Sequence, residues 1–237
     1  MTSKKNWTLR AAVLMLALVL ITSCFVGGTF AKYVTSGDAA DHARVAKWGV
    51  TVTAHETGDI FAQSYDNTVI ADGNYKVIAP GTKKDDAALV TLSGKPEVSV
   101  KVTYSAEHFS LTGKWVGDEN DTFYCPLIIK VTGKVGDTVK TETINCAEKN
   151  SAAEIETAVQ NAVAACSATY APNTDLSSAA VDGEGLKISW EWPFEGTANP
   201  GQTDEMDTYL GDQAAKTSGL DVPSIHIPVT ATVTQID

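Results

Sequence analysis

Residues 98–104 read VSVKVTY, the clearest strand pattern in the chain. The apolar side chains occupy every second position: Val98, Val100, Val102 and Tyr104. Polar residues fill the positions between them. Because successive side chains of a strand point to opposite faces, this alternation predicts a strand with one face in a core and the other in solvent. We therefore expect a fold built from half-buried strands.

Further strands are predicted on both sides of this stretch, separated by turn-forming Gly, Pro, Asn and Asp residues. They cover residues 44–53, 75–78, 87–92, 109–115, 123–131, 139–144, 186–192 and 225–233. In the first strand, one face is expected to carry Ala46, Trp48, Val50 and Val52. The strands before and after residues 133–137 should form a hairpin. Pro228 should place the last strand at an edge or introduce a bulge.

One helix should interrupt the strands. The stretch Ser151-Ala152-Ala153-Glu154 is a capping box, in which the Ser151 hydroxyl accepts from the Glu154 amide and the Glu154 carboxylate reaches back. Apolar residues follow at helical spacing: Ile155, Val159, Ala162, Val163 and Cys166. The pattern predicts an inserted helix over about residues 152–165, and a helical turn over residues 204–215. The fold class expected is mostly β, a β-sandwich with one inserted α-helix.

The first 31 residues follow the plan of a secretory signal peptide. Three basic residues precede an uncharged run from Ala11 to Ala31, which ends in Thr29-Phe30-Ala31. The small residues Thr29 and Ala31, at positions −3 and −1, predict cleavage before Lys32 and export of the remainder. Two alternatives stay open: an uncleaved anchor, because the run is long enough to span a bilayer, and lipoprotein processing at Cys24, which follows Ile21-Thr22-Ser23.

The sequence around this site, GGTFAKYVTSG at residues 27–37, leads through a polar spacer at 38–42 into ARVAKWGVTVTA at 43–54. It resembles the exported proteins of the TasA/camelysin type, which a SipW-type signal peptidase processes in Gram-positive bacteria. The resemblance is specific over residues 20–54 and otherwise rests on the β-rich pattern. It implies a secreted, jelly-roll-like β-sandwich, here a single domain over residues 43–237. In the best understood members the protein polymerises into biofilm matrix fibres, and the mature N-terminal segment completes the next subunit's sheet.

Residues 32–42 are therefore expected to be an extended segment that donates a strand to a neighbouring copy. The segment begins with Lys32, Tyr33, Val34 and Thr35, of which Tyr33 and Val34 are good strand formers. Strand addition to an open sheet edge would drive self-assembly into a homo-oligomer or fibre. The strand at residues 225–233 is the candidate acceptor. Membrane contact is expected only through the signal segment before cleavage.

The charge of the mature chain limits its partners. Removing residues 1–31 takes away 3 of 18 basic residues and none of the 29 acidic ones, so the formal net charge becomes −14. Nucleic acid and anionic membranes repel such a surface, so neither is expected as a partner. Solubility outside the cell is the interpretation we favour.

Three cysteines remain after cleavage, Cys125, Cys146 and Cys166, and this odd number leaves at least one without an internal partner. An exported location permits a disulfide. The sequence leaves three arrangements open: a Cys125–Cys146 bridge, a Cys146–Cys166 bridge, or simple buried thiols.

No enzymatic chemistry is expected. His42, His55, His108 and His226 do not have the spacing of metal ligands, and no Gly-x-Ser-x-Gly nucleophile motif is present. A secreted camelysin-like metalloprotease is therefore the less favoured alternative. No cofactor is expected, although two acidic clusters contain candidate calcium ligands: Asp118, Asp121, Asp204 and Asp207.

Trp190 and Trp192 lie two positions apart, so they share one face of a predicted strand. Exposed, they would form a sugar-binding platform. Facing the core, they would pack as ordinary aromatic residues, which is the interpretation we favour. The exposed arrangement would support the alternative function, a monomeric module that binds glycans or host ligands.

Overall fold

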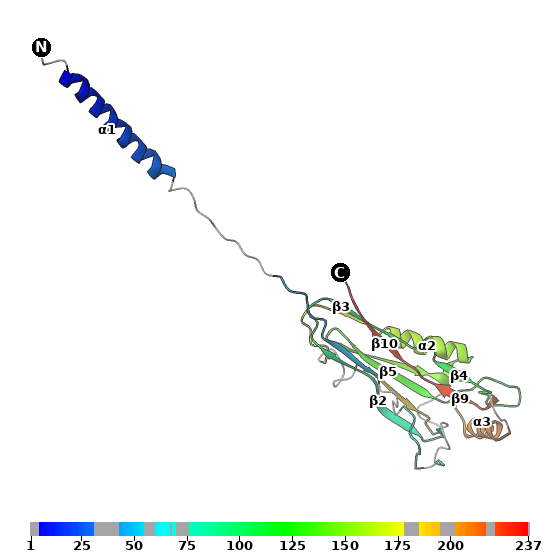
Figure 1. Cartoon of the computed structure of the whole chain (residues 1–237). Helices are drawn as coiled ribbons and strands as arrows, with labels where there is room; N and C mark the ends of the chain where they lie inside the picture. Colours follow the sequence, from blue (N-terminus) through cyan, green and yellow to red (C-terminus); the bar gives the residue numbers. More distant parts are fainter. Residues whose placement is uncertain are drawn as a thin grey trace. The chain divides into compact units, whose positions relative to one another are not determined.

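The structure is a computed structural model that describes residues 5–30, 43–54, 60–66, 68–69, 76–177, 185–194, 202–216 and 221–236. The chain divides into two compact units, Met1–Val45 and Ala46–Asp237. The first unit contains α1 (Lys5–Phe30), and all the other elements belong to the second (Figure 1). Among the residues described, no helix is both long and apolar enough to cross a membrane.

The second unit is mostly β, as expected, and all its strand pairs are antiparallel. A five-stranded sheet has the order β1 (Val50–Ala54), β2 (Lys83–Gly94), β8 (Leu186–Glu191), β5 (Ile128–Val135) and β6 (Thr138–Asn145). A three-stranded sheet has the order β10 (Thr230–Gln235), β3 (Val100–Ser105) and β7 (Ala168–Tyr170). β4 (Ser110–Thr112) pairs with β9 (Ser224–His226). Two helices, α2 (Ala152–Ala164) and α3 (Asp204–Lys216), and the short 3-10 helix η1 (Cys146–Glu148) complete the described elements.

One apolar cluster contains the inward side chains of both larger sheets. In β3 the predicted alternation is confirmed, since Val100, Val102 and Tyr104 are buried while Lys101 and Thr103 are exposed. The central strands β5 and β8 contribute side chains that are completely buried: Ile129, Val131, Leu186 and Ile188. This shared core is what holds the two sheets together.

The predicted helix is confirmed as α2. The Ser151 hydroxyl accepts a hydrogen bond from the Glu154 amide at 3.3 Å, and the Glu154 carboxylate accepts from the Asn150 amide at 3.0 Å. The capping box is thus closed, one residue further back than the standard pattern. All five apolar residues predicted for its inner face are buried: Ile155, Val159, Ala162, Val163 and Cys166.

Several predicted boundaries are wrong. The first strand starts at Val50 rather than Arg44, because Gly49 takes a left-handed φ of 55° that a strand does not allow. Trp48, expected in its apolar face, is 42% exposed. Residues 76–78 are not in a strand, and Tyr75 lies outside the described residues.

The hairpin and the last strand also differ from the prediction. The hairpin turn is only Gly136-Asp137, and residues 133–135 belong to β5. The C-terminal strand is divided: β9 and β10 belong to different sheets, and Pro228 lies in the segment between them. A proline lacks the amide that a continuous ladder needs, which explains the interruption. The predicted helical turn at 204–215 is a full helix, α3.

Candidate strand-addition site

Within the part of the chain that the structure describes, each of the two larger sheets ends in strands that have a partner on one side only. These edge strands are β1 and β6 in the five-stranded sheet, and β10 and β7 in the three-stranded one. The expected edge position of the C-terminal strand is thus confirmed for β10. However, β10 and β1 contact each other, so these two edges lie together. The opposite edge strand, β6, is the more accessible candidate.

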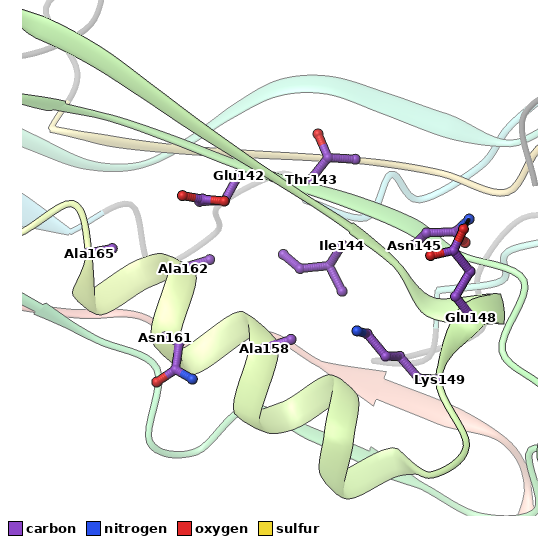
Figure 2. A pocket seen from close by; sticks show the side chains of 10 residues that line it. All are labelled: Glu142, Thr143, Ile144, Asn145, Glu148, Lys149, Ala158, Asn161, Ala162 and Ala165. Atoms are coloured by element: carbon purple, nitrogen blue, oxygen red, sulfur yellow. Dashed lines mark hydrogen bonds between the residues drawn. The ribbon is translucent and has the colours of Figure 1, made fainter.

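A groove of about 450 Å³ runs between β6 and α2 (Figure 2). Its β6 side is formed by Glu142, Thr143, Ile144 and Asn145, its α2 side by Ala158, Asn161, Ala162 and Ala165, and its end by Glu148 and Lys149. A second hollow, of about 520 Å³, shares Lys149, Ala158 and Asn161 with it. The groove therefore continues along the outer surface of α2.

The lining suits an extended backbone. The alanines of α2 leave the helix face shallow, and Ile144 supplies an apolar side chain that is 6% exposed. Seven of the eight residues of β6, all except Ile144, are exposed or half-exposed, and among the described strands β6 pairs only with β5. An edge strand next to a shallow groove is the arrangement that binds peptides by strand addition.

Charged groups of both signs line the two hollows. Three carboxylates, from Glu142, Glu148 and Glu154, outnumber the single ammonium group of Lys149. Glu142 also forms an ion pair with Lys140 on the same strand, at 3.5 Å. The lining is therefore weakly acidic and favours a segment with a basic end.

The predicted donor segment cannot be placed. Ala31 and residues 32–42, which include Lys32, Tyr33, Val34 and Thr35, lie outside the described residues. Thr29 and Phe30, the other residues of the predicted cleavage site, belong to the last turn of α1. Cleavage and strand donation therefore remain predictions from the sequence.

The first pair of candidate calcium ligands lies in a surface turn. The Asp118 carboxylate accepts hydrogen bonds from the Thr122 hydroxyl at 2.8 Å and from the amides of Asn120 and Thr122. These bonds, those from Thr122 foremost, hold the pKa of Asp118 below its usual value. Asp121 stands in the left-handed conformation, with φ of 56°. The Asp118 carboxylate thus closes its own turn.

The second pair lies in α3. Asp204 is in its first turn, whereas Asp207 is buried and accepts from three donors: Tyr124 Oη at 2.5 Å, Trp192 Nε1 at 3.1 Å and Gln202 Nε2 at 2.8 Å. Asp207 therefore anchors α3 to the sheet, a role that the sequence did not indicate. Among the described residues, no three His, Cys, Asp or Glu side chains are grouped so that they could hold a metal ion.

The alternative in which Trp190 and Trp192 form an exposed sugar-binding platform is wrong. Trp190 is 2% exposed and Trp192 6%. Trp190 donates its indole hydrogen to the Ile60 carbonyl, and its ring packs edge-on against Tyr65, with centroids 5.8 Å apart. The two rings are core residues, which confirms the favoured interpretation and removes the observation that would have supported glycan binding.

His108 and His226 are exposed, as expected for His226, while His42 and His55 lie outside the described residues. All three cysteines of the second unit are buried free thiols: Cys125, Cys146 and Cys166.

Comparisons with models of known protein families, with curated proteins and with solved structures found no match to this chain.

Proposed function

We propose that this chain is an exported structural protein that assembles by β-strand addition into matrix or cell-surface fibres. Its second unit would be a jelly-roll-like β-sandwich, and residues 32–42 of one copy would add to a sheet edge of the next. The observation that carries the proposal is the accessible edge strand β6 beside the groove that α2 borders (Figure 2).

The acceptor edge in this proposal is β6 rather than the C-terminal strand. The edge of β10 lies against β1, which leaves less room for an added strand. β6 instead opens on a groove whose α2 side carries three alanines. Strand addition needs both a row of backbone groups and space for side chains, and β6 supplies the two together.

The length and charge of the donor segment support this arrangement. Residues 32–42 number eleven, which in extended form span about 36 Å. The eight residues of β6 span about 27 Å, so the segment covers the whole edge. Cleavage before Lys32 would leave a side-chain ammonium and a free α-amino group at its start. Both charges suit the weakly acidic lining of the groove.

Electron microscopy of two purified proteins tests the proposal, one starting at Lys32 and the other at Ala43. We expect filaments from the first and none from the second. Filaments from both would show that residues 32–42 are not the donor. Monomers from both, at concentrations well above micromolar, would overturn fibre assembly and favour the monomeric binding module.

A variant of α2 tests the acceptor. Ala158 lines both hollows, so Ala158→Gln should fill the groove and reduce the filament mass recovered by sedimentation about tenfold, which corresponds to about 1.4 kcal/mol. Ala164 is exposed on the same helix and lines neither hollow. Ala164→Gln is the matched control and should assemble normally. Equal assembly of the two variants would exclude this groove while leaving strand addition elsewhere intact.

A further inference from the structure

Two of the three buried thiols meet at the open end of the β5–β6 hairpin. Cys125 precedes β5 by three residues, and Cys146 directly follows β6. The pairing of Ile128 with Asn145 brings these chain ends together, and the Cys146 amide donates to the Leu127 carbonyl at 2.9 Å. The Cys125 side chain, ahead of burial, raises the pKa of the Cys146 thiol, as expected for neighbouring groups.

The third thiol follows α2 and packs against a different part of the same hairpin. Cys166 Sγ donates to the Ala162 carbonyl at 3.4 Å, and it faces Gly133, where an added Cβ would come within 2.8 Å of the sulfur. Gly133 is five residues along β5 from Ile128, a distance of about 17 Å. A disulfide needs Cα atoms within about 7 Å, so the placement disfavours the Cys146–Cys166 bridge.

We propose that Cys125 and Cys146 form a disulfide that closes the base of the β5–β6 hairpin, and that Cys166 remains the odd thiol. This bridge does not depend on fibre assembly. Should the assembly proposal hold, the bridge would brace the hairpin that provides the acceptor edge.

The oxidant is a low-molecular-weight disulfide. The thiolate of one cysteine attacks it, forming a mixed disulfide and releasing one small thiol; the second cysteine then attacks the mixed disulfide and releases the other. One small disulfide is consumed and two small thiols are formed, so electrons and protons balance. Both protein thiols are completely buried, and the neighbouring Cys125 side chain, together with burial, raises the pKa of Cys146. Because the thiolate is the reactive form, the bridge should form during folding rather than in the closed native state.

The test uses the full chain carrying Cys24→Ser, which removes the fourth thiol. The protein is refolded with oxidised glutathione, alkylated in denaturant and digested with trypsin. Cleavage after Lys130, Lys140 and Lys149 places the three cysteines in separate peptides. We expect one alkylated thiol, on Cys166, and a cross-linked pair of peptides containing Cys125 and Cys146. Three alkylated thiols, or a cross-link that includes Cys166, would overturn the proposal.

Two variants complete the test. With Cys166→Ser added, the cross-link should persist, and reductant should lower the melting temperature by roughly 6–12 °C, the shift expected when a loop of this size is opened. With Cys125→Ser instead, the cross-link should disappear and reductant should have no effect. If reductant leaves the melting temperature of the Cys166→Ser protein unchanged, no such bridge braces the fold. This result is decisive even if the Cys125→Ser protein fails to fold.

Discussion

The helices α2 and α3 have the same length, 13 residues, but they are held to the sheets in opposite ways. α2 buries an apolar stripe of Ile155, Val159, Ala162 and Val163. α3 buries only Leu210 and the carboxylate of Asp207, which accepts hydrogen bonds from Tyr124 and Trp192, near the ends of β5 and β8, and from Gln202 just before the helix. An apolar stripe can be predicted from the residue spacing within one helix. A polar anchor cannot, because it depends on donors from distant positions in the chain.

Removing the polar anchor should have the largest effect. Asp207→Ala leaves the Tyr124 hydroxyl and the Trp192 indole N–H buried without their acceptor, and removes one of the two acceptors of the Gln202 amide; each unsatisfied group is costly. We expect the free energy of unfolding to fall by about 4 kcal/mol, measured by urea denaturation. Asp212→Ala, at an exposed position of the same helix, is the control and should be neutral. A loss below about 1 kcal/mol for Asp207→Ala would mean that the anchor does not stabilise the fold.

Removing part of the apolar stripe should cost slightly less. Ile155 is completely buried beneath α2, so Ile155→Ala should lower the free energy of unfolding by about 3 kcal/mol through lost burial and a residual cavity. Thr157→Ala, on the exposed side of the same helix, should change it little. Equal stabilities of the two variants would contradict the packing of this face.

Alkaline pH should destabilise the attachment of α3 more than that of α2. Burial, and then the hydrogen bond and charge of Asp207, raise the pKa of Tyr124 above its ordinary value of 10.0. With a raised folded-state pKa, this contribution to stability is complete below pH 10 and declines as the pH rises through the folded pKa. We expect a decline of about 1 kcal/mol per pH unit above 10.

Hydrogen exchange is the measurement for this prediction. Amides of α3 should lose protection above pH 10 before those of α2, after correction for the intrinsic exchange rate. Tyr124→Phe should abolish the difference in pH dependence between the helices. If α2 and α3 lose protection together in the unaltered protein, Tyr124 ionisation does not control the α3 anchor.

The smallest effect should come from the cap of α2. Ser151→Ala removes the hydroxyl that accepts from the Glu154 amide and should lower the free energy of unfolding by about 1 kcal/mol. Ser151→Asp keeps an acceptor and should restore most of this loss. Failure of Asp to exceed Ala in stability would show that the cap hydrogen bond is not the cause.

Much of the local structure could be predicted. The periodicity at residues 98–104 and the spacing from Ile155 to Cys166 both indicate which face is buried, because each pattern is complete within a few turns or residues. The type of candidate site, an open sheet edge, could be predicted from the sequence, but the full set of edge strands could not. The sequence indicated an edge strand at residues 225–233, and β10, which covers part of that range, is one, but no local pattern indicated that β6 is also an edge strand. The alternation of apolar and polar residues along a strand does not determine which strands will lie beside it.

The sequence by itself determined the mainly β class, the half-buried face of β3 and the extent of α2, and it favoured the core position of Trp190 and Trp192. These features follow from periodic burial, which is a local property of the chain. Only the tertiary structure decided which strands stand at the edges, which two thiols meet, and that Asp207 is buried. Each of these depends on partners far away in the chain, as with Tyr124, which is 83 positions from Asp207. No local pattern carries that information, because the free energy of a buried polar group or a free edge is set by what lies beside it.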